Sequence, residues 1–254
     1  MKTIVAIGGG EIGRAGFSVE TAEIDKEIIR LSGKKNPRLL FIPTASSDSE
    51  QYYSDIKKHF GGGLGCQTDA LYLIKEKHSK KEIEQKIFVS DIIYVGGGNT
   101  LKMMKIWRRL GVDVMLKKAY NKGIILSGVS AGAICWFDSG HSNSMSFYNP
   151  KKWSYINVAG LGLAKGIYCP HYDRDSDGAP RKIYFEQMIS KAGGMGIGVD
   201  NKCAIEFIDG KYFKVITAKP GAAAYRIYKM RGKVVSEKIE TKNGLVPICE
   251  LYKK

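Results

Sequence analysis

The stretch Gly123–Trp136, which reads GIILSGVSAGAICW, constrains the fold more than any other part of this chain. It opens with a short apolar, partly β-branched run that is typical of a buried parallel strand. The chain then turns through Ser130, which has a glycine two residues before it and another two residues after it, and Ala133–Phe137 continues as an apolar helix. A strand, a tight turn around a serine and a helix together predict a nucleophile elbow.

An elbow of this kind has a chemical consequence, because the turn lifts the Ser130 hydroxyl out of the edge of the sheet. The flanking glycines let strand and helix approach without Cβ clashes, and the helix N-terminus presents free N–H groups to negative charge. Glycine is abundant, at 30 of 254 residues, so the Gly-x-Ser-x-Gly pattern alone is weak. Its position between a predicted strand and a predicted helix makes Ser130 a candidate nucleophile.

Strands and helices alternate along the first half of the chain, which predicts an α/β fold with a mostly parallel sheet and helices on both faces. Since 254 residues suffice to bury one such core, we expect residues 1–254 to form a single domain. The expected strands are Thr3–Ile7, Arg38–Thr44, Thr68–Ile74, Asp91–Val95 and Gly123–Leu126, and the expected helices include Ser18–Leu31, Lys80–Phe88, one that ends at Leu110, and Val112–Tyr120.

The second half is less regular. Asp138–Pro150 is interpreted as a polar loop. The tail alternates apolar and polar residues around turns at Asp209-Gly210 and Arg231-Gly232, which predicts antiparallel hairpins that extend the sheet. Between the loop and the tail we expect short apolar runs at Val158–Leu163 and Gly166–Cys169, a helix over Arg181–Ile189 and a strand over Gly196–Val199.

The glycines after the first expected strand allow another interpretation. Gly8, Gly10 and Gly13 match the Gly-x-Gly-x-x-Gly pattern of dinucleotide sites. Such sites have an acidic residue at the tip of the next strand to hold the ribose, whereas here that strand runs into Pro43-Thr44-Ala45. We therefore interpret the glycines as a tight strand–helix turn and expect no cofactor.

A serine nucleophile needs a base and a group that orients the base. Of the four histidines, only His171 follows a predicted strand, at the same sheet edge as Ser130. Asp200 and Asn201 also end a strand, and Asp173 is a local competitor for the orienting position. An aspartate would stabilise the imidazolium, whereas an asparagine orients the ring without a charge, so the choice stays open.

The oxyanion formed during attack needs hydrogen-bond donors. The N–H of Ala131, the residue after the candidate nucleophile, is one donor. The second is expected from the glycine-rich turn at Gly96–Gly98, most plausibly Gly98, because this turn also follows a predicted strand.

Three motifs together resemble the peptidase E (aspartyl dipeptidase) family, which includes cyanophycinase and is related in fold to class I glutamine amidotransferases. They are Val95–Thr100 (VGGGNT), Gly128–Ala133 (GVSAGA) and Cys169–Tyr172 (CPHY). The motifs keep the family's order and approximate spacing. The similarity runs from the first strand into the C-terminal hairpins.

This resemblance implies a serine peptidase in which Ser130 is the nucleophile and His171 the base, with oxyanion donors at Gly98 and Ala131. It also implies that Asn99 and Thr100 line the substrate pocket. Arg181 is the nearest match to the arginine that binds a substrate carboxylate in that family, a role that suits the guanidinium fork.

The chain departs from the family at the third member of the triad. In peptidase E this residue is a glutamate within a Gly-Leu-Pro-Glu-Gly stretch. Aligning that stretch on Gly198 places Asn201 at the glutamate, with Asp200 one residue earlier. The family's aspartate after the elbow has no clear counterpart either, and Asn143 or Asp138 occupies that region.

The formal net charge of +15 would favour anionic partners. The lysines are scattered, however, and no recognition helix, zinc finger or aromatic RNA-binding pattern occurs, so we expect a solvated basic surface and no nucleic acid. No apolar run approaches the ~18 residues of a membrane span, and the N-terminus is interpreted as a strand, so we expect a cytoplasmic protein without a membrane partner. Five widely spaced cysteines predict neither a disulfide framework nor a zinc site.

These observations predict a serine exopeptidase or dipeptidase that hydrolyses short peptides, with N-terminal Asp-X peptides as candidate substrates. We expect no cofactor and no metal, a short peptide as the partner, and allow for a homodimer. The alternative is a catalytically impaired member of the same fold that binds anionic ligands, because the third triad position departs from the family.

Overall fold

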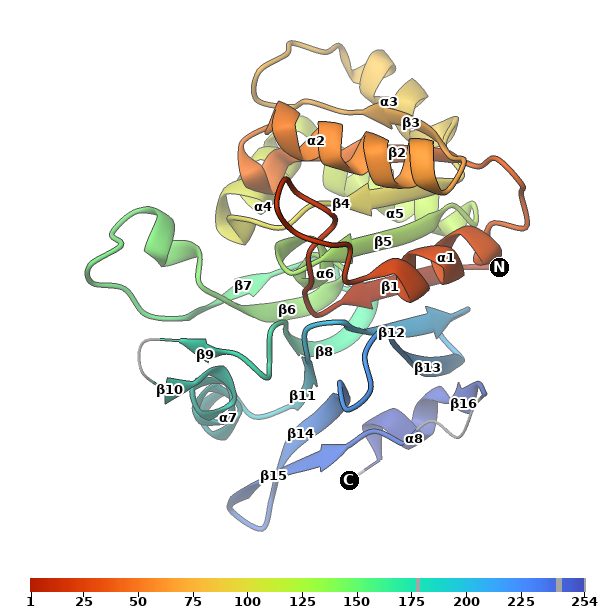
Figure 1. Cartoon of the computed structure of the whole chain (residues 1–254). Coiled ribbons are helices and arrows are strands. Elements are labelled where there is room, and N and C mark those ends of the chain that lie inside the picture. The colour runs from red at the N-terminus through yellow and green to blue at the C-terminus, as the bar shows by residue number, and fades with distance from the viewer. Residues whose placement is uncertain (177–178, 241–243, 254) are drawn as a thin grey trace.

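Two sheets form the centre of the computed structural model, which describes residues 1–176, 179–240 and 244–253 (Figure 1). In this part of the chain the larger sheet has the strand order β16-β13-β12-β1-β5-β4-β2-β3, and the second has the order β15-β14-β11-β8-β6-β7. The strands of the larger sheet are β1 (Thr3–Ile7), β2 (Arg38–Ile42), β3 (Gln67–Ala70), β4 (Ile92–Val95), β5 (Ile125–Val129), β12 (Cys203–Ile208), β13 (Tyr212–Thr217) and β16 (Val246–Pro247).

The second sheet follows β5 in the chain. Its strands are β6 (Phe137–Ser142), β7 (Ile156–Ala159), β8 (Ala164–Cys169), β11 (Met195–Val199), β14 (Ala224–Met230) and β15 (Lys233–Lys238). Strand β9 (Asp175–Ser176) pairs with β10 (Ala179–Pro180). The α-helices are α1 (Ala22–Leu31), α2 (Glu50–Ile56), α3 (Lys80–Phe88), α4 (Thr100–Leu110), α5 (Val112–Asn121), α6 (Ala131–Ile134), α7 (Arg181–Ala192) and α8 (Ile248–Tyr252).

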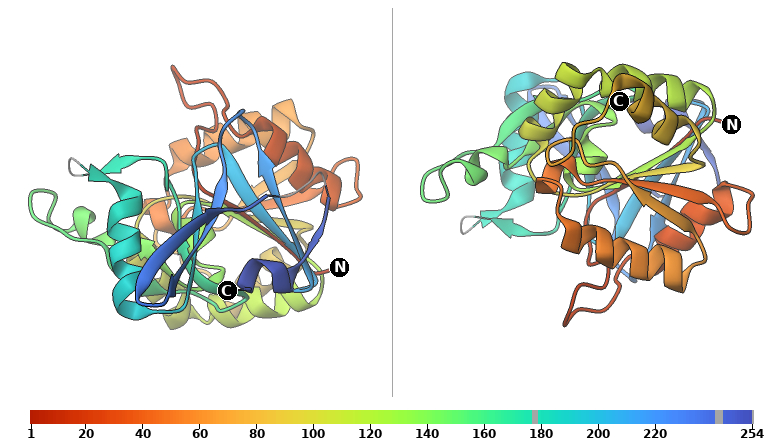
Figure 2. Two further views of the ribbon diagram at one scale, coloured as in Figure 1. Left: turned by 90° about the horizontal axis from the view of Figure 1, so that it is seen from below. Right: turned by 90° about the horizontal axis from the view of Figure 1, so that it is seen from above.

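The predicted α/β architecture is confirmed. β1, β5, β4, β2 and β3 pair in parallel, and so do β6, β8 and β11. Antiparallel strands lie on both sides of the parallel group in the second sheet, and on the β1 side of the group in the larger sheet, where β3 is the edge strand. Parallel neighbours need long crossovers, and the helices supply them, with α1 and α2 on one face of the larger sheet and α4 and α5 on the other (Figure 2).

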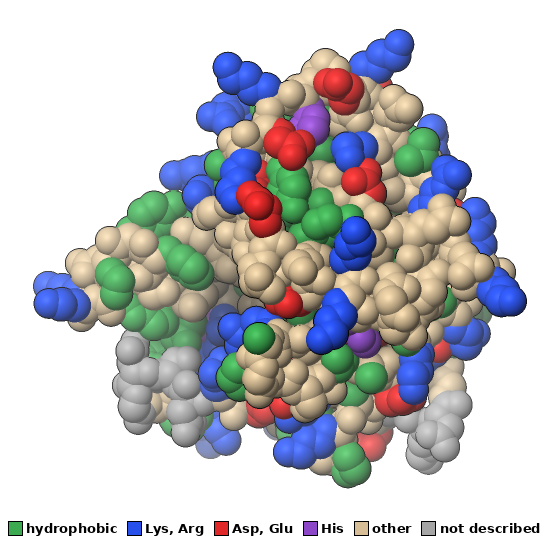
Figure 3. Space-filling view, turned by 45° about the horizontal axis from the view of Figure 1, so that its top comes forward, with side chains coloured by type: hydrophobic (Ala, Val, Ile, Leu, Met, Phe, Trp, Pro, Cys, Tyr) green, Lys and Arg blue, Asp and Glu red, His purple; other side chains and the backbone are tan. Residues whose placement is uncertain are grey.

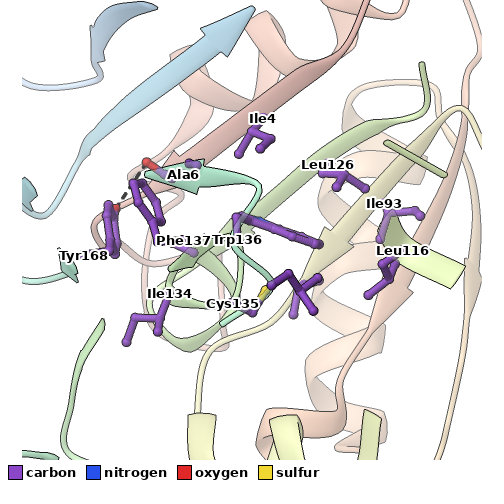
Figure 4. Close-up of a cluster of buried hydrophobic side chains, with 14 of the residues drawn as sticks. Ile4, Ala6, Ile93, Leu116, Leu126, Ile134, Cys135, Trp136, Phe137 and Tyr168 are labelled. Atoms are coloured by element: carbon purple, nitrogen blue, oxygen red, sulfur yellow. Dashed lines mark hydrogen bonds between the residues drawn. The ribbon is translucent and has the colours of Figure 1, made fainter. Parts of the chain in front are cut away.

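Strand β1 shows why both faces of the larger sheet are covered. Ile4 and Ala6 belong to a core cluster with Trp107 of α4, whereas Val5 and Ile7 belong to a second cluster with side chains of α1 and α2. All five residues of β1 are buried, as expected of a strand between two layers of helix. Tyr168 of the second sheet donates a hydrogen bond of 3.3 Å to the Ala6 carbonyl, which ties the two sheets together (Figure 4).

The expected polar loop at Asp138–Pro150 is wrong in its first half. Phe137–Ser142 is strand β6, and its residues from Gly140 onward are buried against β7 and β8. The expected apolar helix is correspondingly short, because α6 ends at Ile134 and the Trp136 carbonyl accepts hydrogen bonds from the Leu163 and Ala164 amides. The side chains of β6 are mostly polar, so the sequence did not indicate a strand. The strand forms by pairing with β7 and β8, which come later in the chain.

The two C-terminal hairpins form where they were predicted. Asp209 and Gly210 have φ angles of 53° and 64°, and Arg231 and Gly232 have 48° and 81°. Positive φ at both central residues is the geometry of the tight hairpin turn that matches strand twist. The hairpins extend different sheets, however, since β12–β13 joins the larger sheet and β14–β15 the second.

Among the described residues, no helix is long and apolar enough to cross a membrane. On the face shown in Figure 3, Lys and Arg side chains are spread around the surface and mixed with Asp and Glu. The charge on this face is therefore distributed and does not form one basic patch.

Candidate active site

Ser130 lies in a strained turn between β5 and α6. Its φ and ψ are 55° and −111°, a conformation that side chains other than glycine rarely adopt and that costs about 1–3 kcal/mol. The surrounding backbone holds it there, since the Ser130 amide donates to the Ile7 carbonyl at 3.1 Å and its carbonyl accepts from the Ala133 and Ile134 amides at 3.0 Å. The strain is therefore balanced by hydrogen bonds from two directions.

His171 is also held by the end of β1. Its φ is 50°, and its amide donates to the Gly8 carbonyl at 3.0 Å. The amide of Lys202 donates to the Gly9 carbonyl at 2.7 Å. Three consecutive carbonyls, from residue 7 to residue 9, thus anchor Ser130, His171 and the residue after Asn201.

These anchors bring the predicted side chains together. His171 Nε2 is 3.0 Å from Ser130 Oγ, and His171 Nδ1 is 2.6 Å from Asn201 Oδ1. Because the amide oxygen can only accept, the Nδ1–H donates to it, and Nε2 is left to accept the Ser130 hydroxyl proton. Asn201 Nδ2 in turn donates to Asp173 Oδ1 at 2.8 Å.

The imidazole of His171 is neutral at neutral pH in this environment. Burial lowers its pKa to about 4, and the positive charge of Arg181 acts in the same direction. The hydrogen bond to Asn201 opposes the shift. The ring is therefore in the form that can take up a proton.

The choice between Asp200 and Asn201 is decided by the direction of their side chains. The Asp200 carboxylate accepts a hydrogen bond of 2.9 Å from the Ala223 amide, and burial raises its pKa to about 6. Within the described residues it makes no hydrogen bond to His171. Asn201 is therefore the residue that accepts the hydrogen bond of the His171 imidazole, whereas Asp200 accepts the hydrogen bond of the Ala223 amide.

Of the predicted oxyanion donors, Gly98 lines the same pocket as Ser130, and Ala131 follows the serine directly as the first residue of α6. The turn Gly96–Gly98 packs against the serine, since a Cβ on Gly97 would lie 3.5 Å from Ser130 Cβ. The amides of Gly98 and Ala131 have no hydrogen-bond partner in the part of the chain that the structure describes. Two free N–H groups beside a hydroxyl are suited to bind a negative oxygen.

The chain is similar to known peptidases. A family model described as Peptidase family S51 matches residues 4–215, most of the chain. The chain belongs to peptidase family S51. It is 35% identical over 229 residues to the "Uncharacterized peptidase YgaJ" of Bacillus subtilis (strain 168), covering 89% of this chain and 92% of that protein.

The chain is also similar to a protein named peptidase E and, in fold, to a solved peptidase structure. The chain is 27% identical over 146 residues to "Peptidase E" of Streptomyces coelicolor, covering 57% of this chain and 55% of that protein. The crystal structure of a peptidase from an acI-B1 actinobacterium superimposes with a TM-score of 0.69 at 18% identity, covering 97% of each chain, which supports the fold alone. The predicted resemblance to the peptidase E family is confirmed.

Two pockets of this S51 peptidase meet at His171. One, of about 480 Å³, is lined by Ser130, Gly97, Gly98 and the side chains of Arg14 and Tyr52 among others. The other, of about 550 Å³, lies beside Asn201 and is lined by charged side chains, including Asp173. The described residues contain no group of three or more His, Cys, Asp or Glu side chains that could hold a metal ion.

The structure does not bring Asn99 and Thr100 to the Ser130 pocket. Asn99 is buried and caps α4, where its Oδ1 accepts a hydrogen bond of 2.9 Å from the Lys102 amide. Thr100 is buried as well and accepts a hydrogen bond of 3.2 Å from Ser142. Both residues fix the turn that carries Gly98 and do not line the pocket.

Arg181 is also placed differently from the prediction. It is buried at the start of α7, donates a hydrogen bond of 2.6 Å to the His141 carbonyl and lies over the ring of Tyr155. It lines neither of the two pockets at His171. Next to burial, its positive charge contributes to the lowered pKa of His171, so Arg181 affects the site electrostatically without contacting the pocket.

Two features of the site were not assigned a role from the sequence. Gly9 lies against the His171–Asn201 pair so closely that a Cβ would overlap both side chains. The run Gly8–Gly10 was the available signal, but it was interpreted only as a turn. The hydrogen bond from Asn201 to Asp173 connects two loops 28 positions apart in the sequence. From the sequence, Asp173 was considered only as a competitor for the position that orients His171.

Proposed function

We propose that this S51 peptidase is a serine-type dipeptidase or exopeptidase that cleaves short peptides with Ser130 as its nucleophile. The observation that carries the proposal is the placement of His171 Nε2 at 3.0 Å from Ser130 Oγ while Nδ1 is held by Asn201. A nucleophile, an adjacent base and an orienting group are the parts that covalent acyl transfer needs.

The reaction follows from this geometry. Ser130 Oγ attacks the carbonyl carbon of the scissile peptide bond as its proton passes to His171 Nε2. The Gly98 and Ala131 amides hold the oxyanion. The C–N bond then breaks, and the imidazolium returns the proton to the leaving amine. In the second half, water attacks the acyl-serine as His171 takes up one of its protons. The bond between the carbonyl carbon and Ser130 Oγ then breaks, and the imidazolium returns the proton to Oγ, which releases the carboxylic acid and restores the serine.

The proposal covers short peptides in general. The Ser130 pocket is lined by Glu11, Arg14 and Asp55, and Arg14 forms a two-pronged ion pair with Glu11. Since Arg181 is engaged with the His141 carbonyl, neither arginine is a free receptor for an aspartyl side chain. Candidate substrates therefore include both peptides with an N-terminal aspartate and peptides with a neutral N-terminal residue. The fully connected hydrogen bonds support hydrolysis over the alternative of a binding protein for anionic ligands.

Covalent labelling tests the proposal directly. A fluorophosphonate reacts with a serine only where a base takes up the proton and the oxyanion site stabilises the adduct. We expect one adduct per chain on the peptide that contains Ser130, and none in Ser130→Ala, when both are mapped by mass spectrometry. Absence of labelling in the wild-type protein, or equal labelling of the variant, would contradict the proposal.

The pH dependence of kcat/KM is a second test. Because the pKa of His171 is lowered to about 4, the base is unprotonated throughout the neutral range and loses activity only as the pH falls through that value. We expect a plateau from pH 8 down to about 5 and an acid limb near 4. Rates on a neutral dipeptide amide are measured over the pH range in which the far-UV circular dichroism spectrum stays unchanged, so that loss of activity does not reflect unfolding. An acid limb at the ordinary histidine value of about 6.5 would contradict a desolvated base.

A further inference from the structure

Asp173 makes two hydrogen bonds to a single residue. Its Oδ1 accepts from the backbone amide and from the side-chain Nδ2 of Asn201, both at 2.8 Å. Asp173 lies two residues after His171, whereas Asn201 follows β11. The carboxylate therefore joins the loop of the base to the loop of its orienting residue.

An asparagine side chain can turn over with little change in shape, so its partners decide which end faces which way. The Asp173 carboxylate only accepts hydrogen bonds, so Nδ2 of Asn201 must face it and Oδ1 must face His171. In the reversed amide, Nδ2 would donate to His171 Nδ1, and the ring proton would move to Nε2. An Nε2–H cannot accept the proton of Ser130.

The carboxylate also supplies the negative charge that asparagine lacks. Burial and the positive charges of Arg181 and Arg174 lower the pKa of His171, and the negative charge of Asp173 acts in the opposite direction. The charged groups around the ring are Asp173 and Arg174 from its own loop and Arg181 from α7. The walls of the two pockets that the ring lines add further charged residues, namely Glu11, Arg14, Glu20, Asp55, Asp200, Lys202 and Lys219. Of these groups, Asp173 is the one joined to the imidazole through a shared hydrogen-bond partner.

We propose that Asp173 is a positioning residue for the base: it fixes the Asn201 amide with its oxygen toward His171, and so sets the Nδ1–H tautomer and supports the imidazolium through Asn201. The catalytic consequence rests on the proposed function. The structural part of the proposal concerns only the tautomer and the basicity of the His171 imidazole, and it is independent of the proposed function.

Two variants separate orientation from charge. Asp173→Asn keeps an oxygen that can accept from Asn201 but removes the charge, whereas Asp173→Ala removes both. We expect kcat to fall about 10-fold in Asp173→Asn and about 100-fold in Asp173→Ala, with KM changed less than about threefold. The matched control is Asp209→Asn, since Asp209 is another exposed aspartate whose Oδ1 accepts a backbone amide, that of Lys2, at 2.7 Å. It is expected to retain wild-type rates.

Nitrogen-15 NMR spectra of the imidazoles measure the tautomer and the pKa of His171 in the same variants, without a substrate. We expect the wild-type His171 ring to be protonated at Nδ1. In Asp173→Asn the tautomer stays and the pKa falls below the wild-type value, and in Asp173→Ala the Nε2–H tautomer also becomes populated. The acid limb of kcat/KM should move to lower pH in parallel. A role limited to holding the loop would lower the melting temperature and move neither the pKa nor the tautomer.

Exchanging the two side chains completes the test. In Asp173→Asn combined with Asn201→Asp, the carboxylate faces His171 and the amide at position 173 can donate to its second oxygen. We expect kcat to return to at least the wild-type value. Unchanged tautomer, pKa and kcat in Asp173→Asn and Asp173→Ala would overturn the proposal, as would a double variant no faster than Asp173→Asn. If wild type cleaves no peptide and Ser130 is not labelled, the proposed function fails, while the spectra still decide the role of Asp173.

Discussion

Replacing Ser130 with alanine is expected to lower kcat/KM for dipeptide amides by at least about 10³-fold, the largest effect of any single change in this chain. The substitution removes the hydroxyl oxygen that lies 3.0 Å from His171 Nε2, which is the proposed nucleophile. The strained turn should remain, because it is held by the backbone bonds to Ile7, Ala133 and Ile134. Initial rates are measured on a panel that includes Asp-X, Ala-X and Leu-X amides.

Ser146→Ala is the matched control. Ser146 carries a half-buried hydroxyl that donates to the Asn143 carbonyl at 2.8 Å, outside both pockets at His171. We expect this variant to retain wild-type rates on every substrate. Equal rates for the wild-type protein and Ser130→Ala would remove Ser130 from the mechanism, whatever the residual activity was due to.

Much of this site follows from rules that the sequence displays. Ser130 follows β5 directly and His171 follows β8 after Pro170, and the carboxyl ends of strands carry the functional residues of such folds. The expectation that both lie at one sheet edge was wrong, because β5 belongs to the larger sheet and β8 to the second, and the carbonyls of Ile7 and Gly8 bring the two residues together. The alternation of buried runs with glycine turns and amphipathic helices predicted the parallel core. Hairpin turns such as Asp209-Gly210 were predictable because their φ values are positive and their residue types tolerate this.

The remaining features depend on contacts between distant segments. Asp200 and Asn201 are neighbours, and they face different partners because the Ala223 amide, next to β14, engages the first while His171 and Asp173 engage the second. No local pattern carries that information. Arg181 was assigned by resemblance alone, and its burial under Tyr155 depends on the loop between β6 and β7, which is distant from it in the sequence.

Strand β6 illustrates the same limit. Its buried half contains glycine, histidine and serine, so hydrophobicity gave no signal. Pairing with β8 and the packing of His141 on Tyr155 bury it, and burial lowers the pKa of His141 to about 2. The polar residues are tolerated because this imidazole stays neutral.

Gly9→Ala is expected to lower kcat/KM about 100-fold or more while the protein stays folded. A Cβ at this position would lie well inside van der Waals contact of His171 Nδ1 and Asn201 Oδ1, the two atoms whose hydrogen bond orients the base. Both are side-chain atoms, so the chain can relieve the overlap by moving the side chains. The movement separates His171 from Asn201 and shifts Nε2 away from Ser130.

The control is Gly62→Ala, the same substitution at an exposed helical position where an added Cβ meets no atom within 4 Å. This variant should keep wild-type rates and melt at or slightly above the wild-type temperature, because alanine reduces the entropy of the unfolded chain. For Gly9→Ala, the His171 nitrogen spectrum should show loss of the Nδ1–H hydrogen bond, with the melting temperature lowered by only a few degrees. Full activity in Gly9→Ala would mean that the His171–Asn201 contact does not limit catalysis. Loss of folding would mean that the end of β1 is rigid, because the overlap could then not be relieved by side chains alone.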